Sequence, residues 1–338
     1  MIECIFTLDY EIYGNGEGSL QELVYEPTER LKTVFEKSNA RFVVFAEAAE
    51  LEIIEANNSD QAINLVKKQI RELYGKGYEL GLHLHPQWYN ARYENNKWQL
   101  DYTEYNLCTL PRNRIEKIVE RSVGYLRRVL GVQDFSPFSF RAGNWLFQPT
   151  QPTAEVLAQH NIRVDSSVFP GGMQHQYRLD YRRAIKNGYY WPFLTDVNII
   201  DRQGILMEFP IYTRMVPFWT IFTSKRIGLQ QKIPKRNRAV NEKILRLFDF
   251  MRLFQSQKLD FCRMTKRELI KILAEEIQRD QKDPDSFRPI IAIGHTKDLV
   301  DLETVDSFLC YLRGKNIPIM TFAEISRERH LHNHQIAP

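Results

Sequence analysis

Residues that could perform hydrolytic chemistry stand in small clusters along the chain, each at the end of an apolar run. The first cluster follows the run 2–8 and contains Asp9 and Glu11. In extended backbone, side chains two residues apart share a face, so both carboxylates can point into one site. Such a pair suits a general base and a metal ligand. Two solvated loop acids are an equally simple interpretation of this cluster alone.

Two histidines, His83 and His85, end the apolar run 79–84. Their spacing again places both side chains on one face of a strand. Imidazole nitrogens are common zinc ligands, so a His-x-His pair at a strand end is a good partial metal site. A lone histidine is usually structural, but this pairing favours metal binding.

Three further clusters carry Arg141, Asp165 and His295, each beside an apolar segment. Arg141 could hold a carboxylate through two hydrogen bonds. His295 suits general acid catalysis, because the pKa of histidine is near neutrality. In isolation, Arg141 also fits a surface salt bridge, and Asp165 fits ordinary turn chemistry. The order of the five clusters along the chain is the stronger signal.

Short strands that alternate with amphipathic helices must position these clusters. We expect strands at 2–8, 41–45, 79–85, 139–141, 162–166, 206–211, 290–295 and 317–322. We expect helices at 29–37, 61–73, 115–130, 153–160, 241–254, 265–279 and 302–313. Repeated βα units favour a parallel sheet, either open or closed into a barrel. A barrel of this kind carries its active site at the carboxyl ends of its strands.

The chain has 338 residues with 43% apolar residues, which is enough for a large core. We predict a single domain over 1–326, with insertions near 87–111 and 214–238, and a disordered tail at 327–338. A net charge of only +4 gives no argument for a nucleic acid partner. The four cysteines are widely spaced, and we expect them to be reduced.

The beginning of the sequence lacks a basic segment ahead of an apolar one, so we expect no signal peptide and a cytoplasmic protein. No apolar run approaches the roughly 18 to 20 residues that span a bilayer. The insertion 214–238 combines aromatic and basic residues, and from Met215 onward it contains no acid. It suits a lid over an anionic substrate or a peripheral membrane contact. An exposed basic loop is the simpler interpretation.

In sequence order, the five clusters resemble the five motifs of the polysaccharide deacetylase family, also called the NodB-homology or carbohydrate esterase family 4 group. The first motif of that family usually reads Thr-Phe-Asp-Asp, where this chain has Thr-Leu-Asp-Tyr-Glu at 7–11. The second usually has two histidines spaced by three residues, where this chain has His83 and His85 after Glu-Leu-Gly. The third, fourth and fifth motifs match Arg141, Asp165 and His295, so the match covers about 2–300.

The resemblance implies an α/β fold, a distorted (β/α) barrel of the NodB type with about seven parallel strands. It also implies a divalent metal, which we expect to be Zn²⁺, with Glu11, His83 and His85 as ligands. Two departures from the motifs leave alternatives open. Asp9 could be the carboxylate ligand in place of Glu11. Gln87 stands where the second histidine of the family would fall, although glutamine is a poor zinc ligand.

By the same resemblance, Asp9 would be the general base and His295 the general acid. Arg141 would brace Asp9, and Asp165 would tune His295. The expected reaction removes an N-acetyl or N-formyl group from an amino sugar of a surface-glycan precursor, linked to a nucleotide or a lipid. Two other functions fit the altered motifs. One is a catalytically inactive barrel that binds a glycan or a protein partner, and the other is a metal-dependent phosphoesterase or other amidohydrolase.

Overall fold

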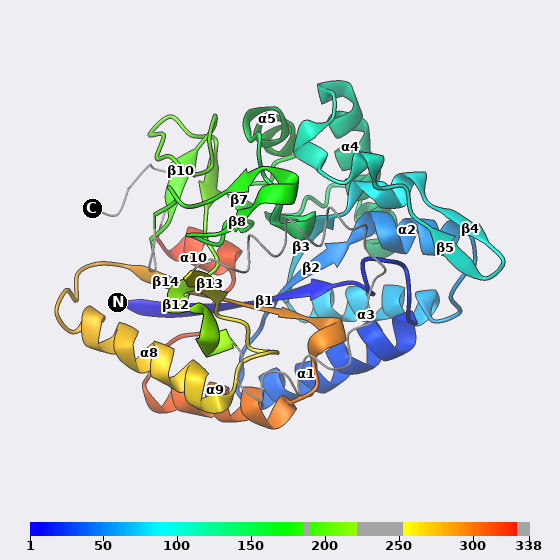
Figure 1. Ribbon diagram of the computed structural model, residues 1–338. Coiled ribbons are helices and arrows are strands. Elements are labelled where there is room, and N and C mark those ends of the chain that lie inside the picture. The colour runs from blue at the N-terminus through cyan, green and yellow to red at the C-terminus, as the bar shows by residue number, and fades with distance from the viewer. Residues whose placement is uncertain (186–188, 222–252, 330–338) are drawn as a thin grey trace.

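A curled eight-stranded sheet forms the centre of the molecule in the computed structural model, which describes residues 1–185, 189–221 and 253–329 (Figure 1). From edge to edge the strands are β10 (Trp191–Phe193), β11 (Leu206–Glu208), β7 (Val164–Asp165), β6 (Ser139–Ala142), β3 (Glu79–Leu84), β2 (Val43–Glu47), β1 (Ile2–Tyr10) and β14 (Arg288–His295). The seven strands from β11 to β14 are parallel, and β10 is antiparallel to its neighbour. The predicted distorted barrel with about seven parallel strands is confirmed.

Backbone contacts bring the two edges of this sheet toward each other. The N–H of Tyr212, just beyond β11, donates to the carbonyl of Ile291 in β14 at 3.0 Å. The N–H of Phe261, just beyond β13 (Phe254–Lys258), donates to the carbonyl of Ile293 at 2.9 Å. The strand β14 is therefore bordered on both sides, which gives the sheet its barrel-like curvature.

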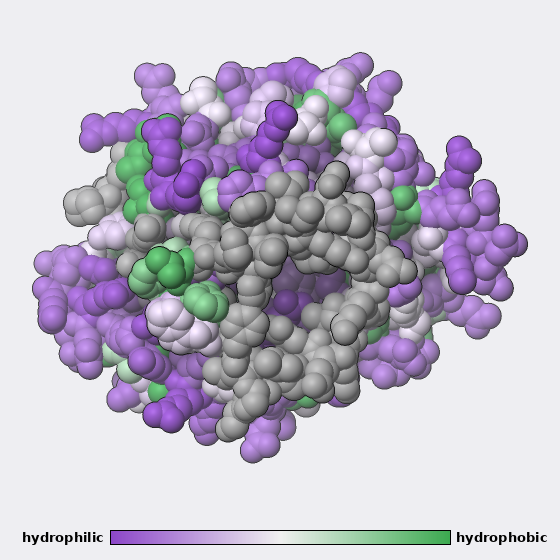
Figure 2. Space-filling view, in the orientation of Figure 1, coloured by the Kyte–Doolittle hydropathy of each residue, from purple (hydrophilic) through white to green (hydrophobic). Residues whose placement is uncertain are grey.

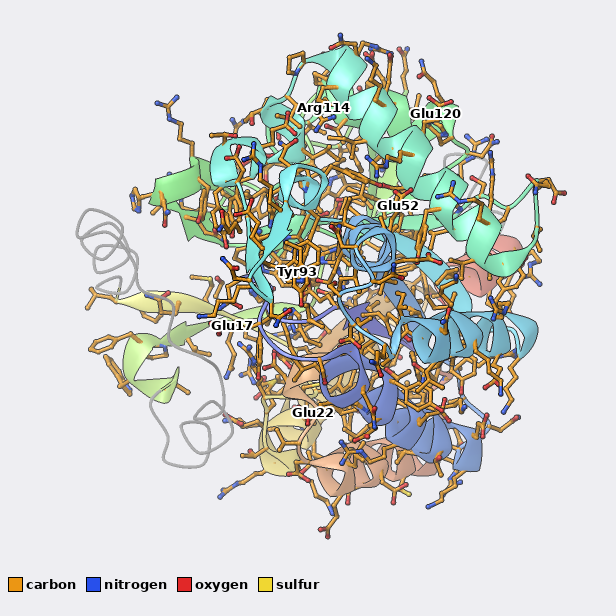
Figure 3. The ribbon with its side chains drawn as sticks, turned by 90° about the vertical axis from the view of Figure 1, so that its right-hand side faces the viewer. Glu17, Glu22, Glu52, Tyr93, Arg114 and Glu120 are labelled. Carbon is orange, nitrogen blue, oxygen red and sulfur yellow. The ribbon has the colours of Figure 1, made fainter. Side chains whose placement is uncertain are left out.

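Helices cover the outside of the curled sheet. They are α1 (Glu26–Lys37), α2 (Ala48–Ala56), α3 (Ile63–Gly75), α4 (Arg112–Leu130), α5 (Gln151–Gln159), α8 (Lys266–Asp280), α9 (Leu302–Gly314) and α10 (Phe322–Glu328). In Figure 1, α8, α9 and α1 lie below the sheet, and α4 and α5 lie above it. Glu52 of α2 faces α4, where it pairs with Arg121 and Arg128 at 2.9 Å and 2.8 Å (Figure 3).

Alternation along β1 decides which side chains face the helices and which face the inside of the barrel. The ring of Phe6 packs against Phe35 of α1 and Phe308 of α9, with centroids 5.2 Å and 5.8 Å apart. Phe6 therefore points outward. Thr7 and Asp9, at odd positions of the same strand, alternate with Phe6 and Leu8, and Asp9 faces the inside.

Among the described residues, three two-stranded antiparallel sheets lie outside the central sheet. They are β4 (Arg92–Glu94) with β5 (Lys97–Gln99), β8 (Met173–Gln174) with β9 (Leu179–Asp180), and β12 (Thr213–Pro217) with β13. The first lies in the insertion 87–111, and β12 begins the insertion 214–238. Hydrophilic residues predominate among the coloured residues of the face in Figure 2, with a small apolar group over β12 and β13. Trp219, which follows β12, is 62% exposed. Residues 222–238 and most of the helix expected at 241–254 lie outside the described residues.

One expectation near the carboxyl end was wrong. In place of a strand at 317–322, a single bridge joins Ile319 to Cys4, and α10 begins at Phe322. Thr321 caps that helix through a capping box with Glu324, and this local signal competes with strand formation. The helix runs to Glu328, two residues beyond the expected domain boundary, and 330–338 lie outside the described residues.

Two other observations concern the cysteines and the helices. All four cysteines are free, as predicted. Within the described ranges, the structure contains no helix whose length and apolar character would let it cross a membrane.

Candidate active site

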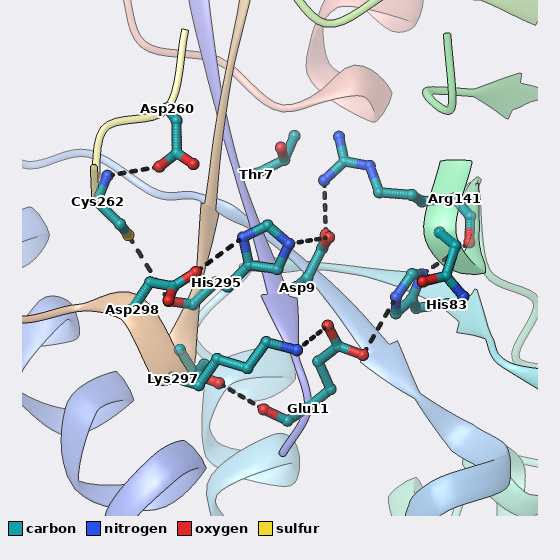
Figure 4. Close-up of polar contacts among 12 residues, drawn as sticks. Thr7, Asp9, Glu11, His83, Arg141, Asp260, Cys262, His295, Lys297 and Asp298 are labelled. Atoms are coloured by element: carbon teal, nitrogen blue, oxygen red, sulfur yellow. Dashed lines mark hydrogen bonds and ion pairs between the residues drawn. The ribbon is translucent and has the colours of Figure 1, made fainter. Parts of the chain in front are cut away.

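Four of the five predicted clusters meet at the carboxyl ends of the strands, on the inner side of the barrel, and Figure 4 shows a residue from each of them. Strand β1 carries Asp9, and Glu11 follows it directly; β3 carries His83, β6 carries Arg141 and β14 carries His295. Asp9 and His295 are register partners across the β1–β14 pair. Parallel strands end at the same edge, so residues separated by almost the whole chain come into contact there.

A buried trio of Glu11, His83 and His85 offers three ligand atoms to one metal ion. The Oε2 atom of Glu11 lies 3.1 Å from Nε2 of His85 and 3.6 Å from Nε2 of His83. These atoms all lie within 4.8 Å of one another, and all three residues are buried. One carboxylate and two imidazoles form a donor set typical of catalytic zinc sites, in which water takes the fourth position. The residues therefore fit a divalent ion.

The tautomer of His83 is fixed for metal binding. Its Nδ1 atom lies 2.8 Å from the backbone carbonyl of Arg141 and can only donate there. In the neutral ring, Nε2 then carries the lone pair and is the atom that would bind a metal ion. A second contact of this kind orients most metal-binding histidines in proteins. Burial alone would lower the pKa of His83, but the charges of Asp9 and Glu11 raise it above its ordinary value.

His85, and not Gln87, completes the trio. The amide of Gln87 lies 3.3 Å from Nδ1 of His85, behind the ring, and the amide of Asn144 lies 3.2 Å from the same atom. Turning the Gln87 amide would let its buried Oε1, which has no hydrogen-bond partner among the described residues, accept the Nδ1–H. A β-carbon on Gly143 would approach the His85 ring to 2.8 Å, so glycine is required beside it.

Glu11 has a second partner, Lys297, just beyond β14. The ammonium of Lys297 donates to Oε1 of Glu11 at 2.6 Å and to the carbonyl of Ile12 at 3.0 Å. Burial would raise the pKa of Glu11, but Lys297 and the two imidazoles outweigh it and hold that pKa well below its usual range. Glu11 is therefore ionised, with Oε1 held by the ammonium and Oε2 turned toward the histidines.

Asp9 is held by Arg141 in a buried ion pair. Nη1 of Arg141 lies 2.6 Å from Oδ1 of Asp9, and the two side chains are 0% and 2% exposed. The remaining guanidinium donors bind the backbone and hydroxyl oxygens of Ser166 at 2.9 Å and 3.1 Å. Burial alone would raise the pKa of Asp9, but the guanidinium and nearby imidazoles lower it. Asp9 is therefore an ionised base at neutral pH.

His295 lies beside Asp9, with its Nε2 atom 3.3 Å from Oδ2 of Asp9. Its Nδ1 atom faces Oδ2 of Asp298 at 3.6 Å, and Asp298 pairs with Arg263 at 2.6 Å. Burial lowers the pKa of His295 to about 4, against the opposing charges of Asp9 and Asp298. The imidazole is therefore neutral at pH 7, with the Asp9 carboxylate facing one ring nitrogen and the Asp298 carboxylate facing the other.

The structure corrects the contact expected for Asp165. We predicted that Asp165 tunes His295, but Asp298 lies in that place. Asp165 accepts a hydrogen bond from Ser167 at 2.6 Å and is paired with Glu208, its register partner on β11. The two buried carboxyls repel each other when both are ionised, and burial together with Asp165 raises the pKa of Glu208 well above its usual range.

Two buried acids behind the metal trio were not predicted from the sequence. Glu47, at the end of β2, accepts the backbone N–H of His85 at 2.7 Å and caps α2. Glu50 accepts the backbone N–H of Ile12 at 2.9 Å. Burial raises the pKa of both acids well above the usual range. They hold the two loops that carry Glu11 and His85, and the sequence gives no motif for either.

Aromatic side chains lie beside the contact between Asp9 and His295. Trp145 follows β6, and both it and Asn144 adopt left-handed backbone, with φ of 66° and 54°. This conformation is unfavourable for a bulky residue and is often found at functional sites. The Trp145 ring lies 6.0 Å from the His295 ring and 6.1 Å from that of Phe169, measured between centroids.

Comparisons with known proteins bear on the fold. No protein-family model and no curated protein matches the chain. Among solved structures, the chain is similar to a Mycobacterium smegmatis protein assigned as a polysaccharide deacetylase, with a TM-score of 0.57, 14% identity and coverage of 100% of this chain and 93% of that one. A corresponding Pseudomonas aeruginosa protein gives a TM-score of 0.50, 12% identity and coverage of 99% and 93%.

A third similar structure is a family 57 branching enzyme from Thermococcus kodakaraensis, with a TM-score of 0.55, 11% identity and coverage of 96% of this chain and 71% of that one. Barrels of this shape therefore carry more than one chemistry, and the reaction must be argued from the site itself. The topology and these similarities together show that this chain has the fold of polysaccharide deacetylases.

Proposed function

We propose that this chain is a metal-dependent hydrolase that removes an N-acetyl or N-formyl group from an amino sugar. One observation carries the proposal: a buried Glu-His-His trio stands beside Asp9, an ionised base that also contacts His295. A metal donor set next to a separate base and a separate proton carrier is the arrangement that amide hydrolysis needs.

Glu11, His83 and His85 would hold the ion, which supplies Lewis-acid polarisation of the acyl carbonyl and a more acidic water. Arg141 occupies Oδ1 of Asp9, so Oδ2 is the atom that accepts a proton from the attacking water. Nε2 of His295 lies 3.3 Å from that oxygen.

The proton can pass from Asp9 to His295 and on to the departing nitrogen. The neutral state of His295 allows this transfer, because its Nε2 atom can accept the proton first. The carbon–nitrogen bond then breaks, the oxygen of water stays on the acyl carbon, and the products are a carboxylic acid and a free amine.

The experiment compares amine release from a panel of N-acetylated and N-formylated sugars, with and without chelator. Asp9→Asn removes the base, and His83→Ala removes a ligand; both variants should abolish turnover, as should the chelator. His160→Gln, at the end of α5, changes an imidazole outside the site and should keep full activity. Activity that survives both the chelator and the Asp9 change would refute the scheme.

A catalytically inactive barrel is a second candidate, and one contact favours it. The Lys297 ammonium already neutralises Glu11 at 2.6 Å, which weakens the attraction of that carboxylate for a cation. Metal content of the purified protein separates the two functions, because an inactive barrel of this kind should contain no stoichiometric metal. The linkage of the sugar to a nucleotide or lipid, the cytoplasmic location and the membrane contact through 214–238 stay predictions.

A further inference from the structure

Lys258, the last residue of β13, extends into the active-site edge from outside the described clusters. It pairs with Thr213 on β12, and its ammonium lies 4.5 Å from the ring centroid of Trp145 and 4.3 Å from that of Phe169. The Trp145 ring in turn borders His295. Lys258 is only partly buried. The Trp145 ring is therefore a shared neighbour of the Lys258 ammonium and of His295.

The other cations at this edge have acidic partners. Arg141 binds Asp9, Lys297 binds Glu11, and Arg263 binds Asp298. Nε of Arg263 also lies 3.9 Å from Oδ2 of Asp260, which is two residues beyond Lys258 in the sequence. Among the residues that the structure describes, no carboxylate lies within ion-pair distance of Lys258, and its recorded contacts are the two aromatic faces.

An ammonium in this position is costly without an anion. Burial lowers the pKa of Lys258 to about 8; Asp260 and Asp9 act against this shift, and Arg263 and Arg141 add to it. The faces of tryptophan and phenylalanine attract a cation, but they compensate only part of the lost hydration. A bound anion would supply the missing partner, and a charge-assisted contact of this kind is strong in a partly desolvated site.

We infer that Lys258 binds an anionic group of the substrate, a carboxylate or a phosphate, while Trp145 supports the sugar ring. This inference rests on the proposed function and names its substrate class: an acidic or phosphorylated N-acyl amino sugar. The Trp145 ring lies near both Lys258 and His295, so a sugar beside this ring can present the acylamino group to Asp9 and an anionic substituent to the ammonium.

Charge at the site agrees with this class. Among the described residues, Arg141, Arg263 and Lys297 each have an acidic partner at this edge, whereas Lys258 has none. An ammonium without a carboxylate partner favours a negatively charged group on the substrate. A purely structural Lys258 would instead act through its packing on the two rings, and a neutral side chain of similar length would then replace it without effect on selectivity.

Binding is measured by calorimetry with full-length protein that carries Asp9→Asn, so that no turnover occurs. The probes are N-acetylglucosamine, its 6-phosphate and N-acetylmuramic acid, which separate a neutral sugar, a phosphate and a carboxylate. We expect at least one anionic probe to bind about tenfold more tightly than the neutral sugar, which corresponds to about 1.4 kcal/mol. Adding Lys258→Gln should abolish this preference and Lys258→Arg should keep most of it. Lys68→Gln, at an exposed lysine, should leave it unchanged.

The inference is overturned if the preference survives Lys258→Gln, if neutral and anionic sugars bind equally, or if none of the probes binds. Amine release by the protein with Asp9 intact reports on the proposed function separately. Deacylation without anion preference rejects the role of Lys258 and keeps the hydrolase. Anion preference that depends on Lys258, without deacylation of any sugar, rejects the hydrolase and keeps the anion site.

Discussion

Replacing Arg141 by methionine tests the buried ion pair on which the proposed base depends. The Arg141–Asp9 contact of 2.6 Å is almost fully shielded from solvent. At an effective dielectric constant of about 20, two unit charges at this distance attract each other by about 6 kcal/mol. Desolvation offsets part of this energy, so removing one partner should cost about 3–5 kcal/mol of unfolding free energy, because an uncompensated buried carboxylate remains.

Urea unfolding at pH 7 measures this cost, with Arg128→Met as the matched control. Arg128 forms a comparable 2.8 Å pair with Glu52, but its side chain is 62% exposed. Exposed pairs contribute about 0–1 kcal/mol, so the control should change little. Adding Asp9→Asn to Arg141→Met should recover part of the lost stability, because the stranded charge is removed. Equal effects of the two arginine changes, or no recovery in the double variant, would refute this reasoning.

Three further predictions follow from contacts described above. Gly143→Ala should weaken metal binding, measured by calorimetry, by about tenfold or more, because the β-carbon of the alanine would lie 2.8 Å from the His85 ring. An unchanged metal affinity would contradict the need for glycine at this position. Asp298→Asn should lower kcat by about 10- to 100-fold. It should also move the limb of the pH–rate profile that reports His295 to lower pH, because the Asp298 charge raises the pKa of His295. A pH–rate profile identical to that of the original protein would exclude this role. Glu208→Gln should stabilise the protein more at pH 8 than at pH 5, whereas the exposed Glu116→Gln should not. The folded chain keeps a proton on Glu208 that the unfolded chain releases, so stability falls as pH rises through this window, and urea midpoints at the two pH values test it.

Much of the site could be predicted because its signals are local. The period of two along a strand places Asp9 and Glu11, and likewise His83 and His85, on one face. The alternation of strands and helices indicates parallel strands, whose ends share an edge. These local signals were enough to indicate which residues meet. In the structure Asp9 contacts Arg141 and His295, although both are more than 130 residues away in the sequence.

The rest depends on packing that the sequence does not display. Glu47 is both the last residue of β2 and the N-cap of α2, with no loop between them. No turn residue therefore indicates the boundary between this strand and this helix, and we did not predict α2. Asp165 follows the motif order, yet its side chain turns to Glu208, which pairing of β7 with β11 brings beside it. The spacing of three residues between His295 and Asp298 was the available signal for the true neighbour, because a single helical turn brings such residues together.

The position of β14 next to β1 has a consequence for biosynthesis. Glu11, His83 and His85 precede His295 by at least 210 residues, and His295 arrives with β14, which binds β1 in register at Asp9. A ribosome must therefore synthesise the whole segment between His85 and His295 before the contact between Asp9 and His295 can form. A nascent chain that stops short of β14 would contain the Glu-His-His trio without the imidazole that lies beside Asp9.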